Sequence, residues 1–326
     1  MLQVLSGFFI VWAIIGVGYF IGRRNVLGNN AGQVLSRLAF FVGSPALLFE
    51  TLSKADLKAV FAQPLLVAAV SAVGTALLFL LVSRLFFKRS LPETLIGSMS
   101  SSLANSANLG IPIAVFVLGD ASYVAPLLIF QLAFFTPVYL MVLDAATNAE
   151  MARSRATTDS AGTRRSALRS TPLMFLLIIV RNPMIIGSAL GLLAAAYKWT
   201  PPELILEPIH LIGGAAVPAM LLSFGMSLNG TKPLQASEGR RTDTLVASAF
   251  KLFLHPLLAL VFARFALNLE GHALFAAVVA ASLPTAQNVF VAATRYQKGV
   301  TVAKDVVLIT TVLAVPAMLG IAALLG

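Results

Sequence analysis

The sequence has few charged residues and no cysteine. Charged side chains occupy 11% of the 326 positions, whereas hydrophobic residues occupy 58%. A soluble core cannot bury so many apolar side chains in a chain of this length, so the composition predicts a protein surrounded by lipid bilayer. The lack of cysteine excludes disulfides, thiolate metal sites and cysteine nucleophiles.

Motifs for catalysis and for metal or nucleotide binding are also missing. The three histidines have no metal-ligand spacing, and the chain contains no HExxH, Walker A or GxSxG pattern. The sequence therefore predicts neither an enzyme nor a resident cofactor. The formal charge of +10 does not indicate nucleic-acid binding, because the Lys and Arg residues fall between apolar segments rather than on one folded face.

Ten apolar segments are long enough to cross about 30 Å of hydrocarbon, which takes about 20 residues. The predicted spans are 4–22, 31–52, 62–87, 94–118, 123–143, 182–199, 205–228, 244–267, 273–295 and 302–325. No basic segment precedes the first span and no cleavage site follows it, so we interpret it as a retained helix and not a signal peptide. Asn182 and Pro183 are typical of the cap and first residue of a helix.

The basic residues predict the orientation of the spans. Alternate connections carry seventeen Lys and Arg residues on one side and four on the other, which places both termini outside the cell (inner) membrane. The two remaining basic residues, Arg37 and Lys251, lie inside predicted spans near the basic side, toward which they are expected to snorkel.

A segment rich in Ser, Thr and Arg divides the spans into two groups of five. The predicted organisation is a first repeat over 1–143, a disordered cytoplasmic linker with an apolar interfacial segment over 144–181, and a second repeat over 182–326. Landmarks recur about 172 residues apart: Gly16 with Gly187, Pro45 with Pro218, and Pro112 with Pro284. Because five is odd, the second copy must enter the membrane from the opposite side, which predicts an inverted-topology repeat. The alternative is a chance coincidence of Gly and Pro.

Polar side chains concentrate in the fourth and ninth spans, each beside a proline. Because proline removes a backbone donor and clashes with the preceding turn, both helices are predicted to break there. Broken backbone is tolerated in a bilayer only where protein or a water-filled cavity satisfies it. Serines at 100–102 and 106 belong to the same polar group. The candidate substrate-binding residues are Asn105, Asn108, Gly110, Pro112, Pro284, Thr285, Gln287 and Asn288.

Two such breaks in an inverted repeat bring two half-helix N-termini to one site, which favours an anion. The amides of Asn105, Gln287 and Asn288 and the hydroxyl of Thr285 can orient a carboxylate there. None of the thirteen acidic residues is central in a span, which disfavours cation or proton antiport. Sodium coupling through carbonyls, hydroxyls and amides stays open. The alternative for these polar residues is a purely structural role in helix packing.

At these residues the sequence resembles the auxin efflux carrier family, and in particular its bacterial branch of malonate- and malate-type permeases. The segments that carry the resemblance are NSANLGIP in the fourth span, RNP followed by IGSALGLL in the sixth, and ASLPTAQNVFVAATRY in the ninth. The resemblance implies an elevator-type carrier in which the first, second, sixth and seventh helices form a scaffold. It also implies that Asn105 and Asn288 bind the substrate carboxylate, and it allows a homodimer through the second and seventh helices. The short linker and the residues around Thr285 differ from plant members, which disfavours auxin as the substrate.

The predicted fold is thus an all-α membrane protein of ten transmembrane helices in a 5+5 inverted repeat, with the fourth and ninth helices broken and crossing. The predicted function is secondary active transport of a small organic anion, a mono- or dicarboxylate such as malonate or malate, with auxin-like acids also allowed. The alternative is a sodium-coupled solute carrier of the bile-acid-transporter type. The sequence does not decide between H⁺ and Na⁺ as the coupling ion.

Overall fold

The computed structural model describes residues 2–54, 63–156, 182–229 and 240–325, in which the regular structure is helical. The first half contains α1 (Leu2–Arg23), α2 (Ala31–Leu38), η1 (Ala39–Gly43), α3 (Ser44–Ser53), α5 (Gln63–Val82), η2 (Ser83–Phe87), α6 (Leu91–Ser102), η3 (Ser106–Gly110), α7 (Ile111–Ile113), η4 (Ala114–Leu118), η5 (Ala121–Val124), α8 (Ala125–Phe130), η6 (Gln131–Phe135) and α9 (Thr136–Ala156). The second half contains α11 (Pro183–Ala196), α12 (Glu203–Gly214), α13 (Ala216–Ser227), α14 (Arg241–Ala249), η8 (Phe250–Leu254), α15 (His255–Val261), η9 (Phe262–Ala266), α16 (Gly271–Ser282), α17 (Gln287–Tyr296) and α18 (Val300–Leu325).

Each predicted span overlaps helix in these residues. Six continuous helices are long and apolar enough to cross a membrane: Ala31–Ser53, Gln63–Phe87, Ala121–Glu150, Glu203–Ser227, Arg241–Ala266 and Val300–Leu325. Several of them contain π-helical turns that join one α-helical stretch to the next. The exterior of the molecule carries many exposed large hydrophobic side chains, as a lipid-facing surface requires. The chain is therefore a multi-pass membrane protein.

The start of the second half follows from local chemistry. The Asn182 side chain accepts hydrogen bonds from the backbone of Met184 at 3.0 Å and Ile185 at 3.4 Å, and Pro183 is the first residue of α11. These contacts satisfy donors that the first helical turn leaves free, which confirms the predicted cap. A capping box of Ser90 and Glu93 starts α6 in the same way.

The predicted linker begins too early. Helix α9 continues through Asp144 to Ala156, so the first part of 144–181 is helical and not disordered. The Tyr296 hydroxyl donates to Asp144 at 2.6 Å, and the Lys298 ammonium donates to Glu150 at 2.8 Å, which ties this end of α9 to the end of α17. Residues 157–181, including the predicted interfacial segment, lie outside the described residues.

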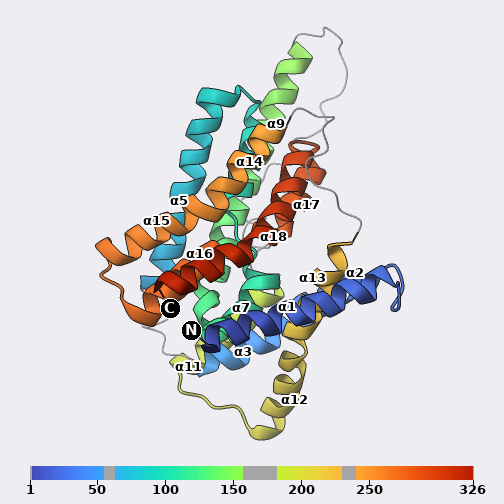
Figure 1. Cartoon of the computed structure of the whole chain (residues 1–326), viewed down its shortest axis with the longest axis vertical. Coiled ribbons are helices and arrows are strands. Elements are labelled where there is room, and N and C mark those ends of the chain that lie inside the picture. The colour runs from blue at the N-terminus through green and yellow to red at the C-terminus, as the bar shows by residue number, and fades with distance from the viewer. Residues whose placement is uncertain (1, 55–62, 157–181, 230–239, 326) are drawn as a thin grey trace.

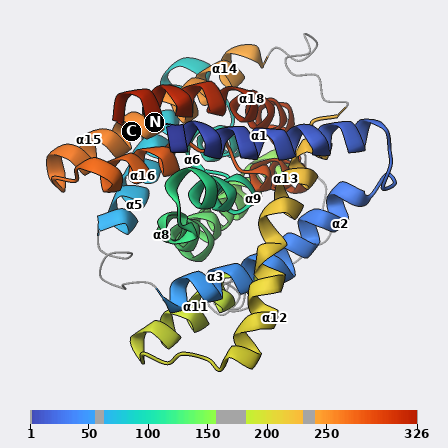
Figure 2. The ribbon, with the colours of Figure 1, turned by 60° about the horizontal axis from the view of Figure 1, so that its bottom comes forward.

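The helices form two groups. Figures 1 and 2 show α2, α12 and α13 on one side of the molecule and α5, α14 and α15 on the other. In the first group, α1 packs closely on α13, and α11 packs closely on α3. The broken helices belong to the second group, where α6 packs on α5, α9 and α14 and α16 packs on α15 and α18.

Glycines permit the two close contacts of the first group. A methyl group added to Gly22 would lie 2.8 Å from the Asn229 side chain, and one on Gly18 would collide with the backbone of Leu222. Gly187 and Gly191 approach the backbone of α3 in the same way, so small residues four apart mediate both contacts. Gly16, the predicted landmark, faces open space, which makes Gly18 the packing counterpart of Gly187.

Candidate functional site

Two helices of the second group are interrupted. The fourth breaks between Ser102, where α6 ends, and Ser106, where η3 begins, and the ninth breaks between α16 and α17. The prediction that both helices break among their polar residues is confirmed. Pro112 does not cause the break in the fourth helix, because it lies in α7, inside the continuous segment Ser106–Leu118. Pro284 does lie in the break of the ninth helix.

The two breaks are hydrogen-bonded to each other, and the place where they meet, Leu103–Asn105 with Pro284–Ala286, is called the crossing below. The N–H of Asn105 donates to the carbonyl of Pro284 at 2.7 Å, and the N–H of Ala286 donates to the carbonyl of Leu103 at 3.0 Å. These bonds make an isolated antiparallel bridge between Ala104 and Thr285. Each interrupted helix therefore supplies partners for backbone groups that the other leaves free, as the low-polarity interior of a membrane requires.

Side chains from two further helices complete the bridge. Buried Gln131 is oriented with its amide nitrogen 2.8 Å from the carbonyl oxygen of Ala104 and its oxygen 2.9 Å from the Ala104 nitrogen, since this orientation satisfies both groups. The Thr310 hydroxyl accepts from the Thr285 N–H at 3.0 Å. The Thr285 hydroxyl donates to the carbonyl of Ser100 at 2.6 Å, so it supports the crossing.

Serine hydroxyls of α6 are also used by the backbone. Ser100 donates to Ile96 at 2.8 Å, and Ser101 and Ser102 donate to the carbonyl of Ser98 at 2.8 and 2.7 Å. Bonds to carbonyls three or four residues earlier are the usual way in which a helical serine satisfies its hydroxyl in an apolar environment. The three hydroxyls are thus satisfied by the backbone of α6 itself, which favours a structural role for these serines over a binding role.

A polar cavity of about 390 Å³ lies beside the crossing. Four of the predicted site residues line it, namely Asn105, Asn108, Gln287 and Asn288. The others lie outside its described lining: Gly110, Pro112, Pro284 and Thr285 are buried among helices. The remaining lining residues are Gln33, Ser36, Arg37, Phe40, Phe41, Leu103, Ala104, Ser106, Ala107, Gln131, Leu132, Thr136, Ala286 and Val291.

Both helices that start at the crossing direct their N-terminal ends to this cavity. Asn105 caps η3, where its Oδ1 accepts from the backbone of Asn108 at 3.2 Å, and Ala286 precedes the first residue of α17. The first turn of a helix has free N–H groups and a partial positive charge, which favour an anionic ligand. Residues from both first turns, Asn108 and Gln287, line the cavity.

Asn105 carries an unused donor at this site. The residue is 3% exposed, and its Nδ2 is buried without a hydrogen-bond partner among the residues that the structure describes. A buried amide group that lacks a partner is unfavourable unless a ligand or water supplies one. Since its Oδ1 is held by the cap to Asn108, the nitrogen is the atom that remains for a ligand.

Sequence reasoning missed Arg37 as part of the site. This residue lies in the last turn of α2, is exposed, and is the charged member of the described cavity lining. It was expected only to snorkel toward the basic side. Its position as a basic residue within an apolar span was a signal that it faces a polar cavity.

Lys251 does not snorkel, contrary to the expectation from the sequence. It is fully buried in η8, and its Nζ donates to the carbonyl of Ala281 at 2.9 Å and lies 2.7 Å from Nδ1 of His255. Ala281 belongs to the last turn of α16, whose free carbonyls carry a partial negative charge. Lys251 therefore compensates the C-terminal end of this half-helix directly behind the crossing.

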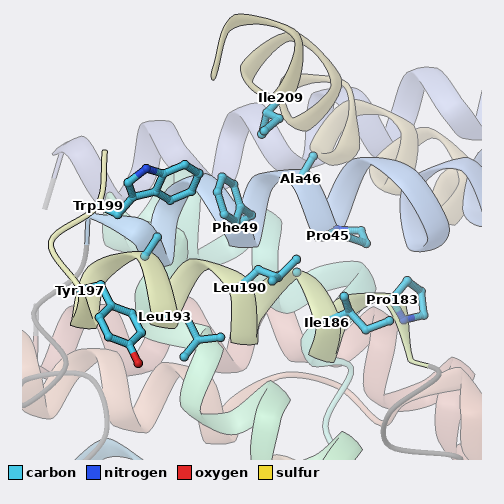
Figure 3. Close-up of a pocket in the computed structure, with 12 residues that line it drawn as sticks. Pro45, Ala46, Phe49, Pro183, Ile186, Leu190, Leu193, Tyr197, Trp199 and Ile209 are labelled. Carbon is cyan, nitrogen blue, oxygen red and sulfur yellow. The ribbon is translucent and has the colours of Figure 1, made fainter. Parts of the chain in front are cut away.

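A further cavity is larger and apolar, and so has a different character. It measures about 950 Å³ and lies between α3, α11 and α12. Figure 3 shows Phe49 on α3, Leu190 and Leu193 on α11, and Ile209 on α12 among its lining residues. Its described lining lacks charged side chains, so we do not assign it to the binding of an anion.

Comparisons with known proteins agree with these features. A candidate malonate transporter of Rhizobium meliloti is 26% identical over 325 residues, which cover 95% of this chain and 92% of that protein. An uncharacterised transporter of Methanocaldococcus jannaschii is 21% identical over 311 residues, covering 93% of this chain and 92% of that protein. The family described as membrane transport protein matches residues 4–322. The chain therefore belongs to the membrane transport protein family, the family of the auxin efflux carriers that its motifs resemble.

Proposed function

We propose that the protein is a secondary active transporter of a small organic anion, a mono- or dicarboxylate such as malonate or malate. The observation that carries this proposal is the polar cavity at the crossing, lined by residues of two helix first turns, by Asn105 and by Arg37. Its described lining contains no acidic side chain. Each of these features attracts a negative charge, and together they disfavour a cation in the same place.

In this proposal the substrate carboxylate binds at the N-terminal ends of η3 and α17. One oxygen accepts from Nδ2 of Asn105, which has no partner within the described chain. Asn108, Gln287 and Asn288 line the same cavity and supply further amide donors. Thr285 and Pro284 act indirectly, because their bonds hold the two breaks together. Gly110 and Pro112 likewise shape the helix that follows the break.

The inverted repeat is part of the proposal and is supported by pairs of matching residues that meet. Gly43 and Ala216, separated by about the repeat spacing, approach so closely that a methyl group on Gly43 would lie 2.8 Å from Cβ of Ala216. Ala104 and Thr285 are 181 residues apart and not about 172, but each lies in the break of its helix, and together they form the antiparallel bridge. Residues that occupy corresponding places in two copies and touch lie close to a twofold axis, which is the arrangement that two oppositely inserted copies produce.

An elevator mechanism is part of the proposal and is supported by the position of the cavity between the two helix groups. Arg37 comes from the group of α1–α3 and α11–α13, whereas Asn105 and Asn288 come from the group with the broken helices. We propose that the first group is a static scaffold and that the second carries the substrate across the membrane. The distribution of basic residues supports both termini lying outside the cell membrane.

A homodimer through the scaffold is a further part of this proposal. The apolar cavity between α3, α11 and α12 lies on the second, sixth and seventh helices, and Phe49 and Leu190 help to line it. A second copy of the chain or lipid tails would cover such a surface in a bilayer. Cross-linking of cysteines introduced at Leu190 in membranes separates the two, because a dimer gives a discrete product and lipid coverage gives none.

Sodium coupling of the bile-acid-transporter type is the alternative. Carbonyl oxygens at the breaks are the natural ligands for Na⁺, but those of Leu103 and Pro284 already accept N–H donors, and Ala281 accepts from Lys251. These contacts favour transport that does not require Na⁺.

The test is flux into proteoliposomes that contain the purified chain. Labelled malonate, malate and indole acetate are supplied with and without Na⁺ and with an imposed pH gradient. Saturable malonate or malate uptake supports the proposal, and its dependence on Na⁺ or pH identifies the coupling ion. Cation flux without any anion uptake would contradict it.

A further inference from the structure

The polar cavity contains a second anion-binding group that does not come from the broken helices. Arg37 lies on α2, which packs mainly on α13, whereas the carboxylate site described above lies at the ends of η3 and α17. Arg37 is exposed at this cavity and forms no ion pair with the described acidic residues. The position therefore offers a guanidinium that is free to bind an anion.

A single carboxylate does not need both groups. The first-turn N–H groups and Nδ2 of Asn105 already provide donors for one carboxylate at the crossing. Arg37 faces the same cavity from the opposite helix group, with Phe40 and Phe41 of the same helix also in the lining. Arginine presents a planar fork of donors that matches the two oxygens of a carboxylate.

We propose that Arg37 binds the second carboxylate of a dicarboxylate whose first carboxylate is held at the crossing. The inference rests on the proposed transport function and adds the residue that selects two carboxylates over one. A cavity of about 390 Å³ accommodates a short dicarboxylate. Because the two contacts belong to different helix groups, a dicarboxylate links the scaffold to the moving group in the state that the structure represents.

The experiment compares two substrates that differ by one charge. Uptake of malonate and of its monomethyl ester is measured in proteoliposomes for the wild type, Arg37→Gln, Arg37→Lys and Arg24→Gln. Arg24 is the matched control, because it is an exposed arginine near the same membrane side and outside the described cavity lining. Thermal unfolding of each purified variant checks that the chain is folded.

Arg37→Gln is expected to raise the KM for malonate roughly 10- to 100-fold, the effect of losing one charged hydrogen-bonded contact. The KM for the monoester stays within about twofold, a change too small for the loss of such a contact. Arg37→Lys retains part of the preference because it keeps the charge but not the fork, and Arg24→Gln behaves as wild type. If Arg37→Gln does not fold, Arg37→Lys replaces it in the test. A rise in its KM for malonate with an unchanged KM for the monoester then supports the inference.

Other outcomes overturn the inference. Equal changes for both substrates in Arg37→Gln would mean that Arg37 does not distinguish the second carboxylate, and unchanged malonate uptake would mean that it only faces lipid head groups. A similar effect of Arg24→Gln would assign the change to surface charge. A wild type that transports neither substrate would instead refute the proposed function.

Discussion

Asn105→Asp tests whether the two polar side-chain atoms of Asn105 have different roles, with Oδ1 capping a helix and Nδ2 binding the substrate. The Oδ1 atom accepts the Asn108 N–H at 3.2 Å and caps η3, whereas Nδ2 is buried without a partner in the described chain. Aspartate keeps the capping oxygen and is as good an N-cap as asparagine. It replaces the amide donor with a second oxygen, so binding and capping are separated in one substitution.

The expected magnitudes differ strongly for the two properties. A hydrogen bond to a carboxylate contributes about 1.5–3 kcal/mol, which is roughly 10- to 150-fold in affinity. Repulsion between two carboxylates about 4 Å apart adds up to about 4 kcal/mol at an effective dielectric constant of about 20. Asn105→Ala removes the donor and the cap together, and loss of the cap lowers the free energy of unfolding by about 1 kcal/mol.

Malonate uptake and thermal unfolding, measured on the same preparations, distinguish these effects. Asn105→Asp is expected to keep the wild-type Tm and lose uptake, whereas Asn105→Ala loses uptake with a lower Tm. Asn148→Asp is the matched control, since it makes the same chemical change on the exposed surface of α9, outside the cavity lining. Normal malonate uptake by Asn105→Asp would refute the assignment of Nδ2 to the substrate.

Three further substitutions, with Gly16→Ala as the control for one of them, test the framework around the site. Gln131→Leu leaves the N–H and carbonyl of Ala104 without their partner, at about 1–3 kcal/mol for each group, so Tm and malonate uptake both fall. Gly225→Ala places a methyl group against the backbone of α1 and lowers the free energy of unfolding by about 1–3 kcal/mol, whereas Gly16→Ala meets open space and leaves Tm unchanged; chemical denaturation measures both. Asp243→Asn weakens two ion pairs with arginines, which lowers Tm in low salt more than in high salt.

Many features of the fold can be predicted from short stretches of the sequence. Hydropathy located segments that are helical in the described residues, because every transmembrane helix must present apolar side chains to lipid along its own length. The cap at Asn182 was also predictable, since its partners Met184 and Ile185 lie within one turn. Pro284 indicated the break in the ninth helix because proline affects the turn in which it sits.

The break in the fourth helix could not be located in this way. It lies at Leu103 to Asn105 because the Pro284 carbonyl, which accepts from Asn105, and the Ala286 N–H, which donates to Leu103, replace the missing helical bonds. Pro112 is accommodated within a helix. The helical start of the predicted linker has the same kind of cause, since residues beyond α17 hold the end of α9. Contacts between residues so far apart in the chain cannot be predicted from the pattern of a short stretch of sequence.

The sequence by itself determined that the chain spans a membrane, which two helices concentrate polar groups, and that Asn105, Asn108, Gln287 and Asn288 are candidates for one site. Only the tertiary structure decided which polar groups are still available to a ligand. It assigned the Thr285 hydroxyl to the backbone of α6, left Nδ2 of Asn105 without a partner in the described part of the chain, and brought Arg37 to the cavity from the other helix group. The reason is that hydrogen-bonding capacity belongs to a residue type, whereas its use depends on which neighbours the fold brings within about 3 Å.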